Sequence, residues 1–462
     1  MHIDAHFVTK IVPQHCIYGS FPVDANFAID SREVQQGDIF VALIGVHVDG
    51  HDFIEQALQK GASGIIANMN RQQDLMQKHA TILQNKSVMF VPDSKQALID
   101  IAHAWRMQFN YPVVAITGSV GKTTTKEMVR NILKQADMQH IVSFGNQNTL
   151  IGISLNILKM RSFHKVAVFE VGISEKGNMK KLVQLLRPTI AAITYVGHGH
   201  LQGLGTVADV AREKREVFSM LSDADIGIIN GDQPELCDVS YAHPVVRFGK
   251  KTTNQIQARK IVTENNSISF IAKIYQKKYN VILPTVNQAR VSNGLCALAV
   301  GKLLNISDEC LIQGISQPTM VDGRFQILPH QSGSIMIHDA YNSNPESLKA
   351  SIAAFESYQT SLKKVLVLGD MMELGAQSNF WHRQLGRMVR KVSDLNCVIL
   401  IGKHVEWAKK TMPLGMTCLK FDSVEDAFDS VKNILLQKDK VLLFKASNSL
   451  RFSELVQKLQ EV

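Results

Sequence analysis

Residues 113–125 read VVAITGSVGKTTT, an apolar run that breaks into a glycine-containing turn and then into Gly-Lys-Thr. A strand followed by such a turn and a helix is typical of a phosphate loop, whose backbone N–H groups bind phosphate oxygens. The usual pattern has a glycine five positions before the Gly-Lys pair, but Ile116 stands there and the nearer glycine is Gly118. The stretch therefore predicts a shortened phosphate loop within a parallel α/β sheet.

The sequence after this loop repeats a strand-then-helix rhythm. Continuous apolar strands that alternate with helices indicate a parallel sheet covered on both faces. From about residue 245 to residue 285 the pattern changes to a two-residue period, as in SISFIAKIY, which predicts an antiparallel edge on the same sheet. The other predicted strands of this central block lie at 165–172, 189–197 and 225–232.

Two further α/β blocks flank the central one. Short strands at 37–45, 62–68 and 87–93 predict a small N-terminal domain, and the segment ISQPTMVDGRFQ indicates the boundary before a third block. The predicted fold class is α/β with three domains. These are a small N-terminal α/β domain at 1–108, a central parallel-sheet domain with the phosphate loop at 109–318, and a C-terminal Rossmann-like domain at 319–462.

Composition narrows the class of protein. With 462 residues, 45% hydrophobic and 20% charged, the chain has the make-up of a globular protein. It contains no run of about 18 apolar residues and no signal-peptide pattern, so we expect a cytoplasmic location without membrane insertion. The six cysteines are scattered without a C-x-x-C pair, which suggests neither a zinc site nor a disulfide framework.

The net charge of +9 has two interpretations, weak nucleic-acid binding or a site for a polyphosphate substrate. The basic residues are spread along the chain without a long basic block. We therefore predict no nucleic-acid partner.

The phosphate loop offers the groups that bind a nucleotide. Gly118 and Gly121 suit a tight turn, Lys122 brings positive charge to the β and γ phosphates, and Thr123 can hold Mg²⁺. The helix that starts here directs its positive end at the anion. The alternative is a glycine turn before an ordinary helix. The order of strand, loop and helix favours the phosphate loop.

Polar positions further along the central block allow more than one interpretation. Glu170 ends an apolar strand, where it is either a Mg²⁺ ligand or a helix cap or ion-pair partner. The GHGH motif at 197–200 is a His-x-His zinc site, a single functional histidine near the nucleotide, or a plain polar loop. Lys214 lies in the amphipathic segment VADVAREKREVFSML, where the pattern alone assigns it to a solvated helix face.

The C-terminal block carries two polar loops after predicted strands. The first, HDAYNSNPES, offers Asp339, Tyr341, Asn342 and Asn344 to a ligand. The second, GDMMELG at 369–375, is similar. Each loop can be ordinary turn chemistry, but two such loops after adjacent parallel strands favour a shared site.

Taken together, these motifs resemble those of the Mur ligase family, the ATP-dependent enzymes that build the peptide of bacterial cell-wall precursors. The family's phosphate loop has the short form TGSVGKTT. Three other motifs are similar to those of the members that add D-alanyl-D-alanine to UDP-N-acetylmuramoyl-tripeptide. They are DAYNSNPES, LGDMMELG with His382 following, and GN-x-N-x-x-x-G at 145–152. The resemblance covers essentially the whole chain.

The resemblance implies roles for the matched positions, with ATP and Mg²⁺ as cofactors. The N-terminal domain would bind the UDP-sugar, the central domain ATP, and the C-terminal domain the incoming dipeptide and the nucleotide. ATP would contact Gly118, Ser119, Val120, Gly121, Lys122, Thr123, Thr124, Asn293, Arg324, Asp339 and Tyr341. The metal ligands would be Thr123, Glu170, His200 and Lys214, and the catalytic residues Lys122, His200 and Lys214. Substrates would contact Ser31, Arg32, Asp49, Gly50, His51, Asn146, Asn148, Asn342 and Asn344.

For Lys214 the resemblance reverses the solvated-face interpretation. The family has a lysine here that is carbamylated by CO₂, and a carbamate converts a cation into an oxygen ligand for a metal. Several other positions depart from the family pattern, and one of them affects an expected polar contact in KASNS at 445–449. The departures are Ser154, Gln202, Ala289, Arg290 and Asn448. Activity is still expected, because the phosphate loop, the acidic residue and the lysine are all present.

The implied reaction activates a carboxylate before it forms an amide. The γ-phosphoryl group of ATP passes to the terminal carboxylate of the tripeptide, and the amine of D-Ala-D-Ala then attacks the acyl phosphate. A second hypothesis is another Mur-type ligase, although the D-N-P-R motif of the diaminopimelate- or lysine-adding enzymes is absent, or a folate polyglutamate ligase. A third is a phosphate-loop ATPase that acts on a protein partner. A monomer is expected.

Overall fold

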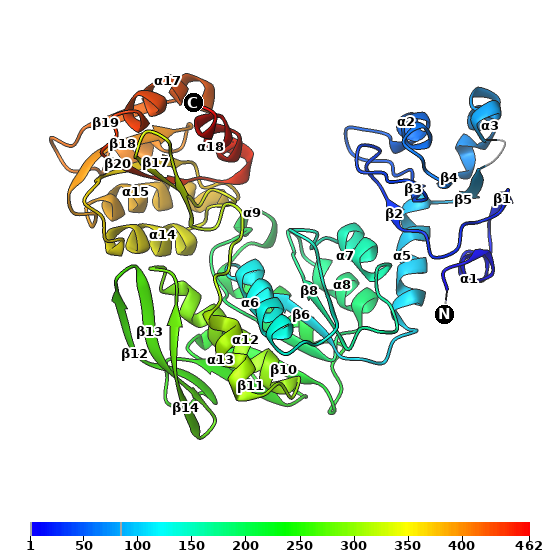
Figure 1. Ribbon diagram of the computed structural model, residues 1–462, viewed down its shortest axis with the longest axis horizontal. Helices are drawn as coiled ribbons and strands as arrows, with labels where there is room; N and C mark the ends of the chain where they lie inside the picture. Colours follow the sequence, from blue (N-terminus) through cyan, green and yellow to red (C-terminus); the bar gives the residue numbers. More distant parts are fainter. Residues whose placement is uncertain (1, 84–85) are drawn as a thin grey trace. The chain divides into compact units, whose positions relative to one another are not determined.

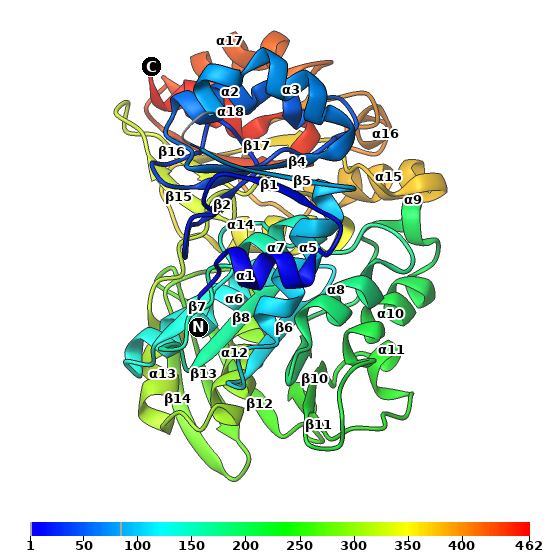
Figure 2. The same ribbon diagram turned by 90° about the vertical axis from the view of Figure 1, so that its right-hand side faces the viewer.

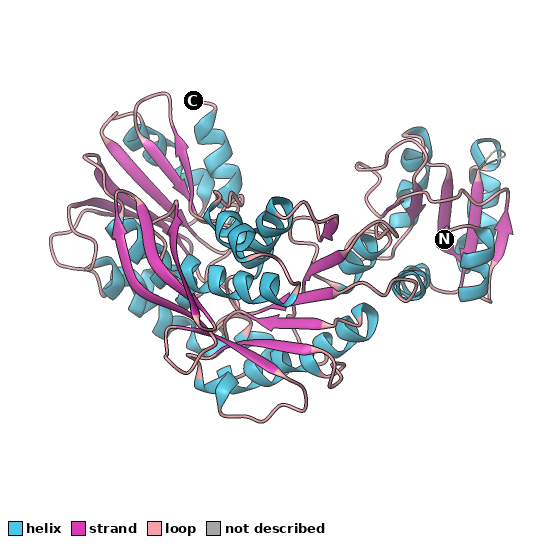
Figure 3. Ribbon diagram, turned by 60° about the horizontal axis from the view of Figure 1, so that its bottom comes forward, coloured by secondary structure: helices cyan, strands magenta, loops and turns pink. Residues whose placement is uncertain are grey.

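The computed structural model describes residues 2–83 and 86–462, which contain both strands and helices (Figure 3). Its strands form three separate sheets, as the α/β prediction requires. The chain divides into two compact units, one made of residues 1–115, 138–172 and 180–189 and the other of residues 116–137, 173–179 and 190–462. The predicted domain limits at 108/109 and 318/319 stay predictions.

The N-terminal sheet has the strand order β1-β5-β4-β3-β2, in which only β1 runs antiparallel to its neighbour among the described pairs. Helices α2 and α3 lie together on one side of this sheet (Figure 2), where Ile54 and Leu75 join a core with Phe40 and Phe90. The elements are α1 (Ala5–Ile11), β1 (Cys16–Tyr18), β2 (Phe27–Ala28), β3 (Ile39–Val41), η1 (Gly50–Phe53), α2 (Ile54–Gln59), β4 (Gly64–Asn68), η2 (Met69–Arg71), α3 (Gln72–Lys78), α4 (Ala80–Leu83), β5 (Ser87–Val91) and α5 (Ser94–Arg106).

The strand predicted at 37–45 is shorter in the structure, because the chain turns back soon after β3. The amide of Gly45 donates to the carbonyl of Val48 at 2.8 Å, and the amide of Gly50 donates to the carbonyl of Leu43 at 2.8 Å. These hydrogen bonds close a loop of their own and end the pairing with the sheet.

The central sheet has the order β14-β13-β12-β11-β10-β9-β6-β8-β7. Strand β13 runs antiparallel to both β12 and β14, which confirms an antiparallel edge from β12 onward. The predicted start of that edge at about residue 245 is wrong, because β11 pairs in parallel with β10 and with β12. The elements are β6 (Val113–Thr117), α6 (Lys122–Gln135), β7 (His140–Val142), α7 (Leu150–Ile157), β8 (Val166–Glu170), α8 (Asn178–Leu186), β9 (Ile190–Ile193), α9 (Leu201–Leu204), α10 (Val207–Arg215), η3 (Glu216–Phe218), β10 (Ile226–Asn230), α11 (Pro234–Cys237), β11 (Val245–Gly249), β12 (Ile256–Glu264), β13 (Ser267–Ile274), β14 (Lys277–Leu283), α12 (Ala289–Leu303) and α13 (Asp308–Ser316).

The C-terminal sheet has the order β15-β16-β20-β17-β18-β19 and is parallel except for the pair β15 and β16. Helices α14 and α15 cover one face and α17 and α18 the other (Figure 1). The elements are β15 (Gln326–Pro329), β16 (Ile335–His338), α14 (Pro345–Ser357), β17 (Lys363–Gly369), η4 (Gly375–Gln377), α15 (Ser378–Val389), β18 (Leu395–Ile401), α16 (Glu406–Lys409), β19 (Cys418–Phe421), α17 (Val424–Leu435), β20 (Lys440–Lys445), η5 (Asn448–Leu450) and α18 (Phe452–Gln460).

Alternation along β17 explains why both faces of this sheet are covered. Leu366 and Leu368 point into the core under α14 and α15, whereas Val365 and Val367 point into the core under α17 and α18. A strand buried on both faces reads as a continuous apolar run, and residues 365–368, VLVL, are such a run. Within residues 2–83 and 86–462, no helix combines the length and the apolar character needed to cross a membrane.

Candidate functional site

The phosphate loop, residues 117–123, joins the end of β6 to the start of α6 as predicted. Gly118 has a φ of +153°, and a Cβ there would lie 2.0 Å from Thr194 Oγ1. Gly121 has a φ of +86°, and a Cβ there would lie 2.3 Å from Asn293 Oδ1. Backbone conformation and close contacts therefore both require glycine at these two positions.

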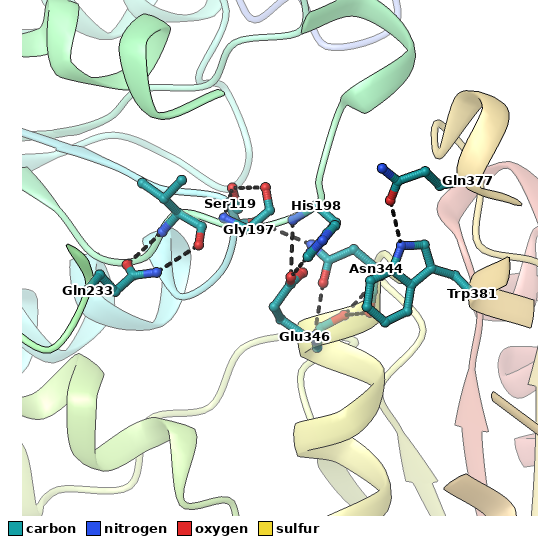
Figure 4. Close-up of polar contacts among 10 residues, drawn as sticks. Ser119, Gly197, His198, Gln233, Asn344, Glu346, Gln377 and Trp381 are labelled. Carbon is teal, nitrogen blue, oxygen red and sulfur yellow. Dashed lines mark hydrogen bonds and ion pairs between the residues drawn. The ribbon is translucent and has the colours of Figure 1, made fainter. Parts of the chain in front are cut away.

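The shape of the phosphate loop is fixed by the segment that follows β9. The amide of Ser119 donates to the carbonyl of Tyr195 at 2.7 Å, and Thr194 Oγ1 donates to the carbonyl of Val120 at 2.6 Å. The amide of Gly197 donates to Ser119 Oγ at 3.0 Å (Figure 4). Lys122 Nζ donates to the carbonyl of Gly118 at 2.8 Å, which keeps the ammonium group over the loop.

A cavity of about 1230 Å³ opens beside this loop. One wall comes from the phosphate loop and α12, and another from loops and helices of the C-terminal sheet. Its volume exceeds the usual range for a site that holds one drug-sized ligand, so it has room for a nucleotide. The predicted ATP contacts that line it are Val120, Gly121, Thr124, Asn293, Arg324 and Asp339.

The remaining predicted ATP contacts lie next to this wall. Gly118, Ser119, Lys122 and Thr123 belong to the same phosphate loop. Tyr341 packs under the guanidinium of Arg324, with 4.3 Å from its carbon to the ring centre. The ring of Tyr341 therefore holds the Arg324 guanidinium in place at the cavity wall.

Sequence reasoning missed the role of Lys445 at this wall. Lys445 Nζ lies 3.2 Å from Asp339 Oδ2 and donates to the carbonyl of Asn342 at 2.9 Å. Both charged side chains are buried, and burial lowers the pKa of the Lys445 ammonium. Asp339 also accepts a hydrogen bond from the amide of Phe325 at 3.0 Å. The available signal was the lysine that opens KASNS, the segment in which the family comparison had found departures.

The two histidines of the GHGH motif pair with different glutamates. His200 Nδ1 lies 2.7 Å from Glu373 Oε2, and this hydrogen bond lowers the pKa of the Glu373 carboxyl. His198 Nδ1 lies 2.5 Å from Glu346 Oε1. Across residues 2–83 and 86–462, no group of three or more His, Cys, Asp and Glu side chains forms a metal-binding cluster. Among the described residues, no such cluster would complete a zinc site around the GHGH motif.

Lys214 corrects the interpretation made from its helix pattern alone. The side chain is only 1% exposed, so the prediction of a solvated face is wrong. Burial, together with the positive charge of Lys122, lowers the pKa of the Lys214 ammonium well below its usual value. An uncharged amine is the form that reacts with CO₂. The burial of Lys214 thus agrees with the carbamate that the family resemblance implied.

Glu170 and Asn148 come together in the first compact unit. The amide nitrogen of the Asn148 side chain donates to Glu170 Oε1 at 2.8 Å, and the Glu170 amide donates to Ser143 Oγ at 3.0 Å. The Glu170 side chain is buried at the end of β8, as predicted. Asn146 lies nearby in the chain, and its carbonyl accepts from the amide of Asn148 at 2.7 Å.

The predicted substrate contacts of the N-terminal sheet have partners within the chain. Ser31 Oγ donates to Gln56 Oε1 at 2.6 Å, and Arg32 binds Asp30, which lowers the pKa of that carboxyl to about 2. Asp49 caps η1, the short helix of Gly50 and His51, and pairs with Arg71 at 2.7 Å. His51 is buried and accepts from the amide of Asn68 at 2.9 Å. Whether these residues contact a substrate stays a prediction.

Asn342 and Asn344 shape the start of α14. Asn344 is the N-cap of this helix and forms a capping box with Ser347. Its side-chain amide also donates to the carbonyl of Ser119 at 3.5 Å. The side chain of Asn342 accepts from the amide of Ser343 at 2.8 Å. Asn344 thus stabilises a helix and touches the phosphate loop, a role that its place in a polar loop had not predicted.

Arg290, one of the departures from the family pattern, holds the segment that leads to the C-terminal sheet. Its two terminal nitrogens donate to the carbonyls of Thr319 and Arg324, each at 2.9 Å. These bonds fix the backbone of Arg324 at the cavity wall.

We expect Arg290→Met to lower the free energy of unfolding by about 2 kcal/mol, because two carbonyls lose hydrogen bonds from a charged donor. Urea denaturation measures this change. Arg383→Met, at an exposed arginine that stacks on Trp407 at 4.5 Å, is the control and should have a smaller effect. Equal stability of the two variants would contradict the role of Arg290.

Known proteins match the chain along most of its length. The Mur ligase family, catalytic domain, matches residues 25–106, the Mur ligase middle domain residues 116–301, and the Mur ligase, glutamate ligase domain residues 323–448. The UDP-N-acetylmuramoyl-tripeptide–D-alanyl-D-alanine ligase of Bacillus subtilis is 31% identical over 438 residues, which is 94% of this chain and 93% of that protein.

Solved structures agree with these sequence matches. MurF from Acinetobacter baumannii superposes with a TM-score of 0.85 at 25% identity, over 100% of this chain and 99% of that one. MurF ligase from Thermotoga maritima in complex with ADP gives a TM-score of 0.78 at 28% identity, over 95% and 97% of the two chains. The three-domain α/β fold predicted from the sequence is confirmed, and the chain belongs to the Mur ligase family.

Proposed function

We propose that this chain is an ATP-dependent ligase that joins D-Ala-D-Ala to UDP-N-acetylmuramoyl-tripeptide during synthesis of peptidoglycan precursors. The observation that carries the proposal is the cavity in which the phosphate loop faces Arg324 and Asp339 from the C-terminal loops. A ligase needs this arrangement, because it must hold a nucleotide and an acceptor carboxylate side by side. Relatives similar along 94% or more of the chain bear the name of this activity.

The described residues provide suitable ligands for Mg²⁺. In the second compact unit, Thr123 and a carbamylated Lys214 would supply oxygen atoms, which Mg²⁺ prefers, and His200 would add an imidazole. Glu170 belongs to the first compact unit, and its part as a metal ligand stays a prediction. Burial lowers the pKa of the Lys214 ammonium, which favours the uncharged amine that a carbamylation requires. Glu373 binds Nδ1 of His200, which leaves Nε2 for a metal. Bound Mg²⁺ would neutralise charge on the transferred phosphoryl group.

The chain's own groups account for the positioning that phosphoryl transfer requires. The amides of the phosphate loop and the first turn of α6 would bind the β and γ phosphates, and Lys122 would add a positive charge. The opposite wall carries charged side chains that are held by the protein itself. Arg324 stacks on Tyr341, and Asp339 and Lys445 form a buried ion pair. Such preorganised charges lower the barrier most where water is excluded.

The second step, attack by the dipeptide amine on the acyl phosphate, competes with hydrolysis. A wall built by the C-terminal loops against the phosphate loop would keep water away from this intermediate. We also propose that the enzyme works as a cytoplasmic monomer, which the molecular mass measured by light scattering would test.

The assay for the proposed function measures phosphate release from ATP with UDP-N-acetylmuramoyl-tripeptide present. D-Ala-D-Ala, diaminopimelate, lysine or no acceptor is added in parallel, and the product mass is read. We expect release that depends on D-Ala-D-Ala and a product with the mass of the pentapeptide. Release with a different amino acid would assign another ligation step, and release without any acceptor would favour an ATPase.

A further inference from the structure

Helix α14 contacts the central part of the chain at its N-terminal end through Glu346. Glu346 Oε1 accepts a hydrogen bond from the amide of His198 at 3.1 Å and lies 2.5 Å from Nδ1 of the same residue (Figure 4). A Cβ at Gly197 would lie 2.5 Å from the carboxyl carbon of Glu346, so the glycine permits this close approach. The carboxylate thus bonds both the backbone and the ring of one histidine.

This contact extends to the phosphate loop. Ser119 shares hydrogen bonds with Gly197 and receives one from Asn344, the N-cap of α14. On the other side the ring of Trp381 meets the ring of His198 edge-on, with 4.6 Å between their centres. The start of α14 is therefore connected to the loop that would hold the phosphates.

The opposite end of α14 makes a second contact with the central part. The turn between β12 and β13 contains Asn266, whose side chain donates to the carbonyl of Gln359 at 3.0 Å and accepts from the amide of Gln359 at 2.8 Å. Gln359 lies two residues beyond the end of α14 at Ser357. Asn266 is not one of the described residues that line the cavity.

A third hydrogen bond also joins the central part of the chain to the C-terminal part, and it can show whether the two are in contact. The amide of Gln202, just after the GHGH motif, donates to the carbonyl of Glu373 at 3.0 Å. Glu373 belongs to the GDMMELG loop and not to α14. This amide loses its acceptor if the C-terminal sheet and its helices move away as a body.

We propose that Glu346 and Asn266 are positioning residues that dock the two ends of α14 and thereby hold the C-terminal wall of the cavity against the phosphate loop. The proposal rests on the proposed function, because the docked arrangement is the one that shields an acyl phosphate. Both contacts consist of a few polar bonds, so docking can reverse for product release. Glu346 acts through His198 and Ser119, and Asn266 acts from outside the cavity.

The test uses Glu346→Gln and Asn266→Gly in the full chain. Glycine tolerates the φ of +56° at position 266, so the substitution removes the amide contact without backbone strain. Asn305→Gly is the matched control, since Asn305 is an exposed residue of the same part of the chain with a φ of +58°. Amide hydrogen exchange of residues 197–204 is measured together with kcat and the KM for ATP.

We expect both variants, but not the control, to speed exchange at the Gln202 amide. We also expect kcat to fall about tenfold in Glu346→Gln and about fivefold in Asn266→Gly, with the KM for ATP changed by less than about twofold. A merely structural role would lower the melting temperature without this exchange signal or the fall in kcat. The proposal is overturned if Glu346→Gln affects the His198 amide alone and Asn266→Gly behaves like the control.

Failure of the proposed function would look different from failure of the docking proposal. If the unmodified chain does not depend on D-Ala-D-Ala in the ligation assay, the proposed function fails, while the exchange measurement still decides whether α14 docks at both ends. If the unmodified chain is active and both variants match the control in exchange and in kcat, docking by these residues is overturned and the ligase remains.

Discussion

We expect Lys214→Ala to lose activity by at least about a hundredfold, which is the scale for removing one preorganised group from a transition state. The lysine is buried on α10 and its pKa is lowered by burial and by Lys122, so the amine can exist uncharged and take up CO₂. An alanine leaves no group to carbamylate. It also leaves space where a short carboxylic acid can place its carboxylate.

Addition of formate or acetate should therefore restore part of the activity of Lys214→Ala and leave the unmodified chain unaffected. The measurement is phosphate release in the ligation assay over a range of acid concentrations, with circular dichroism to show that the variant is folded. Arg212→Ala is the control, because this side chain lies on the same helix but is 69% exposed. Full activity of Lys214→Ala without any added acid would contradict the carbamate.

We expect Lys122→Met to have the second large effect, a fall in kcat/KM of about a thousandfold. Methionine has a similar length and keeps the packing of the side chain, but it removes the ammonium group that lies over the phosphate loop. The β and γ phosphates then lack a positive charge both in the bound state and during transfer.

Two measurements check this expectation. The rate is read in the ligation assay, and the rise in melting temperature with added ATP shows whether the nucleotide still binds. Lys134→Met, at an exposed position near the end of the same helix α6, is the matched control and should keep both the rate and the thermal shift. An unchanged rate in Lys122→Met would show that this loop does not hold the transferred phosphate.

Sequence reasoning predicted those strands and helices that can be recognised from the residues within the element itself. The apolar runs of β6, β8, β10 and β17 and the two-residue period before residue 285 gave the sheet types, because burial of a strand depends on its own side chains. The short strand β19 escaped prediction. Its sequence CLKF is only partly buried at the edge of the sheet and contains no continuous apolar run.

Polar positions were harder to predict, and Lys214 shows why. Its helix has a regular amphipathic pattern, but the pattern does not say which other segments cover the polar face. Glu213 on the same helix accepts from the amide of Met179 at 3.0 Å and is also buried. Family resemblance implied a role for Lys214, which stays a prediction, and only the packing around α10 showed that its side chain is buried.

The sequence by itself determined the order of strands and helices, the short phosphate loop and the family, because spacing and residue type along the chain suffice for these. Only the tertiary structure decided which charges meet. Glu346 lies 148 residues from His198, and Lys445 lies beside Asp339 although strands β17, β18 and β19 come between them in the chain. Such pairs depend on the packing of distant segments, and a hydrogen bond between polar groups is stronger where that packing has excluded water.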